Sequence, residues 1–454
     1  MKILFYTNTP RAFRTTLIGY LYELSQVHDV VLLSEELDSD TQNIINDRSF
    51  FPKIVATIKV HQHTGPTMSI YRRHRYFSKS AQQLICDFKP DIVVASSDWH
   101  SLFEMYLLRL AKNAKILRVT LQDTFNIAEM HNIAKWSDLF KAHTMMPKWL
   151  PLKGRIMAIS VRKYAGHILH YWILPLLVGQ PPFGGTSSYI LSKGLSGCRD
   201  SSCHIVWSRR DYNIHTRSGV PENKLLILPH PFTRAARAIF HAVIPKGKRD
   251  INHMPGTVAV MMPAEEIGFR NSDFALITPE AKRLDWTELL GTMVDILDGW
   301  RILIKPHPVT RNYHLLKKQL GSISSSILFV EPQSHADLVM EQADVIIEFP
   351  RASSTTLFSA AIQCPQKPVF ALDFQHEFLG DCYRDFPGVQ YIDRMEDFRR
   401  VLHEIKEKRY TKSVHNIYEV EPPNSEDICT VLNRLMVSHG GIVEKYHRKR
   451  LVRE

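Results

Sequence analysis

Short apolar runs alternate with amphipathic stretches along the chain, and this alternation predicts strands and helices in turn. The first run, residues 2–7, is followed by apolar positions at helical spacing between residues 17 and 24, and then by a second run at 30–33. A strand, a helix and a strand in so short a stretch indicate the start of a Rossmann-like domain. Further strands are predicted at 91–95, 115–120, 204–208 and 225–228. No Gly-x-Gly-x-x-Gly follows the first strand, so this half has no dinucleotide fingerprint.

The second half repeats the alternation. It predicts strands at 274–278, 301–305, 327–330, 344–349, 369–373 and 389–392, with helices between them. Such an order is typical of a parallel sheet covered by helices on both faces. We therefore predict an α/β fold with two Rossmann-like domains: an N-terminal domain at 1–244, a polar linker at 245–255 and a C-terminal domain at 256–420. The pattern breaks at 126–195, which we interpret as an insertion, and residues 421–454 are predicted to form a C-terminal helix and a basic tail.

Two motifs that suit phosphate binding follow strands of the second domain. Lys305-Pro306-His307-Pro308 ends one strand, because two prolines cannot donate to a ladder and force the chain out of the sheet. Ser353, Ser354 and Thr355 lie between another strand and an apolar helix, where hydroxyl groups cap the helix and free N–H groups attract anions. Taken singly, each motif also fits a surface histidine or a simple helix cap. Ligands of open α/β sheets sit at the carboxyl ends of strands, and both motifs fall there.

These motifs, together with Lys367-Pro368-Val369, resemble the C-terminal half of GT-B nucleotide-sugar glycosyltransferases. The sequence is most similar to bacterial surface-polysaccharide enzymes with His-Pro and Ser-Ser motifs, namely Kdo and sialic acid transferases and CDP-glycerol glycerophosphotransferases. The resemblance implies two domains that face each other across a cleft. It also implies that His307, Ser353 and Ser354 contact the donor phosphate, and we extend this site to Lys305 and Thr355. Glu348-Phe349-Pro350-Arg351 departs from the small or glycine-containing run that is usual before the serines.

Two carboxylates of the first domain are candidates for the general base. Asp98 and Asp123 each follow a predicted strand, and in a GT-B architecture these loops face the cleft opposite the donor. The alternative is that each aspartate only caps a helix. His307 is the third candidate catalytic residue. No metal is expected, since Asp38-Ser39-Asp40 falls in a predicted polar loop and the six cysteines have no zinc spacing.

Charge points to anionic partners. The chain has 57 Lys and Arg against 46 Asp and Glu, a net charge of +11, without any nucleic-acid-binding signature. Residues 141–195 mix cations with Trp, Tyr and Leu, a composition that suits docking on an anionic membrane surface. The alternative for 168–178 is a buried helix. No apolar stretch is long enough to span a bilayer and residues 1–7 do not fit a signal peptide, so we predict a cytoplasmic protein, peripheral on the inner face of the membrane.

The function expected from these patterns is transfer of a sugar, or of a polyol phosphate, from a nucleotide donor to a cell-surface polysaccharide or lipid-linked glycan. The donor is a CMP-, CDP- or UDP-linked substrate, and no separate cofactor is required. Helix N–H groups, hydroxyls and a histidine can hold the charge that develops on the leaving phosphate. Two alternatives remain: an isomerase of the UDP-sugar 2-epimerase type, and a catalytically silent donor-binding scaffold.

Overall fold

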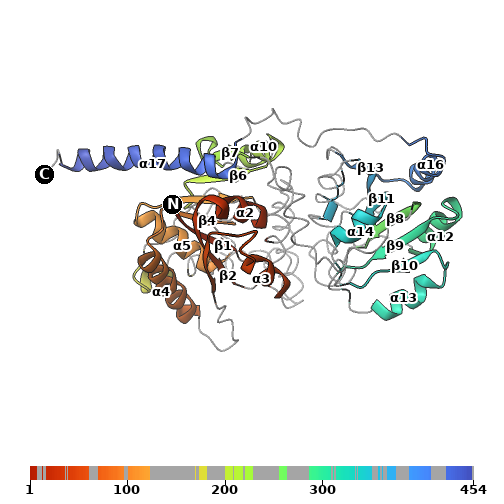
Figure 1. Cartoon of the computed structure of the whole chain (residues 1–454), viewed down its shortest axis with the longest axis horizontal. Coiled ribbons are helices and arrows are strands. Elements are labelled where there is room, and N and C mark those ends of the chain that lie inside the picture. Colours follow the sequence, from red (N-terminus) through yellow and green to blue (C-terminus); the bar gives the residue numbers. More distant parts are fainter. Residues whose placement is uncertain are drawn as a thin grey trace, which may run out of the picture. The chain divides into compact units, whose positions relative to one another are not determined.

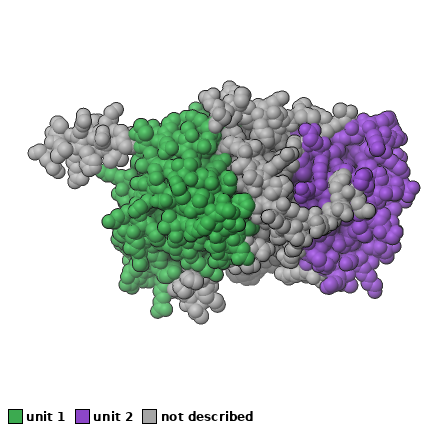
Figure 2. Space-filling model, viewed as in Figure 1, with its two compact units in different colours: residues 1–124, 151–243, 420–454 green, residues 125–150, 244–419 purple. Residues whose placement is uncertain are grey.

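The chain folds into two compact units, which Figure 2 colours separately. Residues 1–124, 151–243 and 420–454 belong to unit 1, and residues 125–150 and 244–419 belong to unit 2. The computed structural model describes residues 1–7, 13, 17–35, 37, 39–60, 70–96, 101–122, 169, 173–180, 200–207, 209–217, 220–228, 255–262, 286–307, 310, 313–332, 334, 336–349, 356–357, 360, 364, 366–374, 388–410 and 426–451.

Unit 1 is built on a parallel sheet of seven strands in the order β3-β2-β1-β4-β5-β6-β7. Figure 1 shows strands β1, β2 and β4 of this sheet with the helices around them. The strands are β1 (Lys2–Thr7), β2 (Asp29–Ser34), β3 (Ile54–Lys59), β4 (Ile92–Ala95), β5 (Leu117–Leu121), β6 (Cys203–Val206) and β7 (Leu225–Ile227). Every residue of β1 and β2 after the first is buried. Continuous burial without alternation is the pattern of parallel strands that are covered on both faces.

Helices cover this sheet. They are α2 (Ile18–Val27), α3 (Ser39–Asn46), α4 (Ile70–Phe88), α5 (Leu102–Asn113), α8 (Leu174–Leu177), α10 (Arg209–Arg217), the short 3-10 helix η3 (Glu222–Lys224) and α17 (Ile428–Leu451). Helices α4 and α5 pack together and share a core with β1, β2 and β4. The last helix, α17, contacts α2, and Cys429 Sγ donates to the Glu23 carbonyl 3.4 Å away. The end of the chain is therefore part of unit 1.

Unit 2 contains a parallel sheet of six strands in the order β10-β9-β8-β11-β12-β13. The strands are β8 (Thr257–Met261), β9 (Arg301–Lys305), β10 (Ile327–Phe329), β11 (Val345–Glu348), β12 (Val369–Leu372) and β13 (Gln390–Ile392), and the helices are α12 (Trp286–Ile296), α13 (Tyr313–Gly321), α14 (Ala336–Gln342) and α16 (Met395–Lys406). Asp344 aligns the two central strands, since its Oδ2 accepts from Gly256 N at 2.8 Å and Thr257 N at 3.0 Å.

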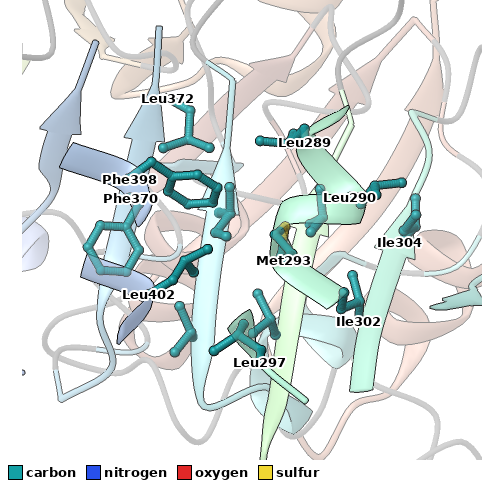
Figure 3. Close-up of a cluster of buried hydrophobic side chains, with 14 of the residues drawn as sticks. Leu289, Leu290, Met293, Leu297, Ile302, Ile304, Phe370, Leu372, Phe398 and Leu402 are labelled. Atoms are coloured by element: carbon teal, nitrogen blue, oxygen red, sulfur yellow. The ribbon is translucent and has the colours of Figure 1, made fainter. Parts of the chain in front are cut away.

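The core of unit 2 lies between this sheet and helices α12 and α16 (Figure 3). Leu289, Leu290 and Met293 lie at helical spacing on α12 and pack over the sheet, and Phe398 and Leu402 of α16 extend the cluster. Each such fully buried side chain contributes about 1.5 to 3 kcal/mol to stability. This core fixes the strands whose carboxyl ends carry the motifs predicted to bind phosphate.

The two parallel sheets confirm the predicted α/β class. Two strands of the structure were not predicted from the sequence. They are β3 at 54–59 and β8 at 257–261, and β8 lies at the centre of its sheet. The strand predicted at 274–278 and nearly all of the insertion predicted at 126–195 lie outside the described residues. The Asp38-Ser39-Asp40 triplet is not wholly a loop, because α3 begins at Ser39.

Candidate functional site

Both sheets reverse their strand order at one point. In unit 1 the chain builds β1, β2 and β3 outwards in one direction and then continues with β4 on the other side of β1. In unit 2 the same reversal falls between β8 and β11. Ligands of open α/β sheets bind outside the carboxyl ends of the strands at such switch points. The side chains at these two edges are therefore the candidate functional groups.

The carboxyl end of β9 carries the Lys-Pro-His-Pro turn. Lys305 is only 4% exposed, and its Nζ donates to the carbonyls of Pro306 at 2.6 Å and Pro332 at 2.7 Å. Pro332 follows β10, so this ammonium joins the ends of two adjacent strands. The geometry gives Lys305 a role in holding the turn, and its predicted contact with phosphate stays a prediction.

His307 lies just beyond this anchored turn. Its residue is partly exposed, and its carbonyl accepts from Thr310 N at 2.9 Å. The position beyond a strand end agrees with where the sequence motif predicted a phosphate ligand. Residues 308 and 309 lie outside the described part of the chain.

The hydroxyl motif follows β11. Ser353, Ser354 and Thr355 lie outside the described residues, whereas Thr356 and Leu357 are helical and Leu357 is fully buried. The described residues therefore include helical residues after β11, and the cap predicted at the serines stays a prediction. Two acidic groups also lie at this edge of the sheet: Glu348 ends β11, and Asp373, which follows β12, accepts from the Tyr391 hydroxyl at 2.7 Å.

At the switch point of unit 1, the Tyr6 hydroxyl joins three elements. It donates to Glu35 Oε1, which follows β2, and it lies 2.6 Å from Ser101 Oγ at the start of α5. Ser101 is the N-cap of α5 and accepts from Glu104 N at 3.1 Å. Ser96, which follows β4, donates to Glu104 Oε1 at 3.2 Å. We refer to these five residues as the Tyr6 cluster.

Burial keeps the Tyr6 hydroxyl protonated. Its pKa is raised well above the ordinary value of about 10, first by desolvation and then by the negative charges of Glu104 and Glu35. Tyr6, Ser96 and Glu104 are at most 1% exposed and Glu35 is 6% exposed. Ser101 is partly exposed, so it is the member of the cluster nearest to solvent in the described part of unit 1.

The candidate bases Asp98 and Asp123 both lie outside the described residues. Their described neighbours in the sequence, however, lie at the carboxyl ends of strands β4 and β5. Ser96 and Ser101 flank Asp98 in the sequence, and Gln122 precedes Asp123. Gln122 is buried, and its Oε1 accepts from Trp207 N at 3.1 Å, which ties the ends of β5 and β6 together.

The sequence-based prediction did not include Tyr6, Glu35 or Glu104. A signal was present for Glu35, since it is a carboxylate directly after an apolar run, the same pattern that singled out Asp98 and Asp123. Nothing in the sequence marks Tyr6, which reads as one more apolar strand position. Within the described ranges, no group of three or more His, Cys, Asp and Glu side chains is arranged to hold a metal ion.

The segment around α8 presents apolar side chains to solvent. Leu174 and Pro175 are buried, and α8 contacts α4. Leu169, Ile173, Leu176 and Leu177 are 38%, 44%, 58% and 61% exposed. The alternative of a buried helix at 168–178 therefore fits only one face of this segment. Among the helices of the described chain, none has both the length and the apolar character needed to cross a bilayer.

Comparisons with known proteins identify the fold. No protein-family profile matches the chain, and no curated protein does either. The UDP-GlcNAc 2-epimerase from Methanocaldococcus jannaschii matches with a TM-score of 0.55 and 13% identity, over 91% of this chain and 94% of that chain. The enzyme from Neisseria meningitidis bound to UDP-GlcNAc matches with a TM-score of 0.53 and 14% identity, over 92% and 96%.

A third structure, the M. jannaschii enzyme in complex with UDP-GlcNAc and UDP, matches with a TM-score of 0.51 and 14% identity, over 96% of this chain and the whole of that chain. The likeness extends over nearly the full length of each protein. Together with the two parallel sheets, it shows that the chain has a GT-B-like fold, as predicted.

Proposed function

We propose that this protein is an enzyme that acts on a nucleotide sugar. The observation that carries the proposal is the match of the two Rossmann-like units to structures of enzymes in complex with UDP-GlcNAc. The chemistry at the end of β9 supports it, because a partly exposed histidine follows a turn that is anchored by a buried lysine. The net charge of +11 favours an anionic ligand.

The reaction that we favour is that of a UDP-sugar 2-epimerase, the alternative left open by the sequence. The three structural matches above are enzymes of this name. Glycosyl transfer to a cell-surface or lipid-linked acceptor is the second candidate. It is favoured by the Lys305-Pro306-His307-Pro308 turn and by the serine motif that begins at Ser353, which resemble those of surface-polysaccharide transferases.

In either reaction, unit 2 would bind the nucleotide. His307, Ser353, Ser354 and Thr355 would hold the phosphates, and Lys305 would fix the turn before His307. Hydroxyl and imidazole groups together with helix N–H groups stabilise anionic phosphate without a metal. Asp98 and Asp123 would serve as the candidate bases of unit 1.

Incubation with nucleotide sugars distinguishes the candidates. An epimerase converts UDP-GlcNAc on its own to a second UDP-sugar, which NMR resolves from the first. A transferase releases free nucleotide only when a glycan acceptor is added, and a scaffold binds the nucleotide sugar without changing it. If a thermal-shift series with UDP, CDP, CMP and GDP sugars showed no stabilisation at all, the nucleotide-sugar assignment itself would be wrong.

We also propose that the protein docks peripherally on an anionic membrane through residues 141–195. The exposed apolar side chains at Leu169, Ile173, Leu176 and Leu177 support this. Lys148, Lys153, Arg155, Arg162 and Lys163 precede them in the sequence, and each cation near an anionic surface contributes about 1 kcal/mol. Such docking would bring a membrane-bound acceptor to the enzyme if the reaction is transfer.

A further inference from the structure

The Tyr6 cluster is arranged to move a proton. Tyr6 has one hydroxyl hydrogen, which it donates to Glu35 Oε1. The contact of 2.6 Å between Tyr6 Oη and Ser101 Oγ must therefore use the hydrogen of Ser101, with the Tyr6 oxygen as the acceptor. Ser101 Oγ accepts in addition from Glu104 N at 3.1 Å. The hydrogen bonds thus run in one direction, from Ser101 through Tyr6 to Glu35.

The two ends of this series of hydrogen bonds differ in their exposure to solvent. Glu35 is 6% exposed and Tyr6 is fully buried, whereas Ser101 is partly exposed. The cluster also lies at the switch point between β1 and β4, where ligands of this class of sheet bind. A substrate group at this edge would meet Ser101 first, and it would reach the buried carboxylate only through the two hydroxyls.

We propose that Ser101, Tyr6 and Glu35 form a proton relay in which Glu35 is the final proton acceptor. A substrate gives a proton to Ser101 Oγ as the Ser101 hydrogen passes to Tyr6 Oη and the Tyr6 hydrogen passes to Glu35 Oε1. The substrate is left with the electron pair, Glu35 becomes neutral, and both hydroxyls are restored. Reversal of the same steps returns the proton.

The groups around Tyr6 are consistent with proton movement from Ser101 to Glu35. Among the described residues, the charged groups that act on Tyr6 are Glu35, from the end of β2, and Glu104, from α5. The ring of Phe103 lies 5.2 Å from that of Tyr6, centroid to centroid, and completes a largely apolar wall. Since the pKa of Tyr6 is raised by desolvation first, the hydroxyl conducts a proton and does not store a negative charge.

The relay rests on the proposed function, because both candidate reactions need a proton acceptor. A transferase must take the acceptor's hydroxyl proton, and inversion of a carbon by deprotonation needs a group that takes one proton and a group that returns another. Glu35 would then supply one proton-transfer group of unit 1, in addition to Asp98 or Asp123.

The test compares variants that each remove one group of the relay with a variant that removes a buried hydroxyl elsewhere. Tyr6→Phe keeps the ring and removes the relay, and Glu35→Gln removes the acceptor. The matched control is Tyr106→Phe, which removes a buried hydroxyl of α5 that lies 2.7 Å from His74 Nδ1, outside the cluster. Ser101→Asn and Ser101→Thr both keep a residue that caps α5, but only threonine keeps the hydroxyl.

With UDP-GlcNAc as the probe, we expect Tyr6→Phe, Glu35→Gln and Ser101→Asn to lower kcat at least about 100-fold with KM and the affinity for UDP little changed. Tyr106→Phe should keep most of the kcat, and Ser101→Thr, which keeps the hydroxyl, should have a higher kcat than Ser101→Asn. If the wild-type chain turns over the probe and Tyr6→Phe matches Tyr106→Phe in kcat, the relay is wrong and the proposed function stands. If the wild-type chain turns over no nucleotide sugar, with or without a glycan acceptor, the proposed function and the relay are both overturned.

Discussion

The ammonium of Lys305 donates to the carbonyl of Pro332 at 2.7 Å and so connects the carboxyl ends of β9 and β10. The same group donates to the carbonyl of Pro306 at 2.6 Å, next to His307. A buried cation is retained in a protein interior when its donors are paired, and these two carbonyls pair two of the three donors of Lys305. Lys305 therefore determines the shape of the loop that would meet the phosphates.

Lys305→Met should lower both stability and nucleotide affinity. Methionine keeps the apolar stem but leaves the carbonyls of Pro306 and Pro332 without this donor, and each unsatisfied buried group costs about 1 to 3 kcal/mol. Thermal unfolding and calorimetric titration with UDP measure the two effects.

The chain offers a matched control in Lys367→Met. Lys367 Nζ also donates to two carbonyls, those of Met340 at 3.0 Å and Glu341 at 2.6 Å, but it precedes β12 and lies at the opposite edge of the sheet. This control should lose stability and keep its affinity for UDP. Equal loss of affinity in both variants would show that Lys305 has no specific role at the site.

Most strands and helices could be predicted from the sequence, because the pattern of buried residues in each one appears directly as a pattern of apolar residues. Strands such as β1, whose residues are buried on both faces, read directly as apolar runs. The central strand β8 was not predicted, because its run follows a segment rich in prolines and lysines that reads as a linker. A short buried run shows no alternation of apolar and polar residues that would mark it as a strand. Its pairing with β9 and β11 in the structure is what identifies β8 as a strand.

Candidate site residues divide in the same way. The positions of Lys305 and His307 at the end of β9 were predictable, because prolines beside them mark the end of the strand, and their role as phosphate ligands stays a prediction. Tyr6 was not, since its hydroxyl gains a role only when β2 and α5 bring Glu35 and Ser101 to it. Contacts between residues this far apart in sequence depend on the strand order, which no local pattern encodes.

His307→Ala, and the pair Ser353→Ala with Ser354→Ala, should each weaken nucleotide binding without unfolding the protein. Loss of a hydrogen bond to a charged phosphate costs about 1.5 to 3 kcal/mol, or roughly 10- to 150-fold in Kd. His314→Ala serves as the control, because this histidine is exposed on α13. Unchanged affinity for UDP in both test variants would rule out the phosphate site predicted from the sequence.

Asp98→Asn or Asp123→Asn should lower kcat by about 10²- to 10⁴-fold if the residue is the general base, with nucleotide affinity retained. The amide keeps the size of the side chain and can still cap a helix, so the alternative role as an N-cap predicts little change. Steady-state kinetics with UDP-GlcNAc, and with an acceptor if transfer is observed, separate the two roles. Rates near wild type in both variants would exclude these residues as the base.

His215 should make unit 1 less stable in mild acid. Burial lowers its pKa, against the opposing effects of Asp211, whose carbonyl accepts from Nδ1 at 2.8 Å. The ring of His204 lies 4.9 Å away, centroid to centroid. The unfolded chain, with a pKa of about 6.5, binds a proton before the folded chain does, so the contribution to stability is complete above that pH and is lost as the pH falls below it.

The free energy of unfolding should therefore decline from about pH 7 to about pH 5, by at most roughly 1.4 kcal/mol per pH unit for each proton. In His215→Gln this decline should be shallower. Urea denaturation at several pH values measures it, and His403→Gln, at an exposed position of α16, is the control. Parallel curves for wild type and His215→Gln would contradict the assignment.

Membrane docking provides the last prediction, and it depends on the two faces of the segment around α8. Leu174 and Pro175 hold the segment on unit 1, whereas Leu176 and Leu177 are 58% and 61% exposed. Insertion of one leucine side chain into a bilayer contributes about 1.5 to 3 kcal/mol. The double substitution Leu176→Ser and Leu177→Ser should therefore weaken binding to vesicles at least about 10-fold and leave the fold intact.

Flotation of the full chain with phosphatidylserine-containing and with purely phosphatidylcholine vesicles checks this expectation. Binding should require the anionic lipid and should fade as salt is raised, because the cations that precede the segment are screened. Leu315→Ser is the control, since that leucine is 67% exposed but belongs to α13 of unit 2. If the wild-type chain stays with the soluble fraction at low salt, the exposed leucines serve a purpose other than membrane docking, and the positive charge acts on the nucleotide sugar alone.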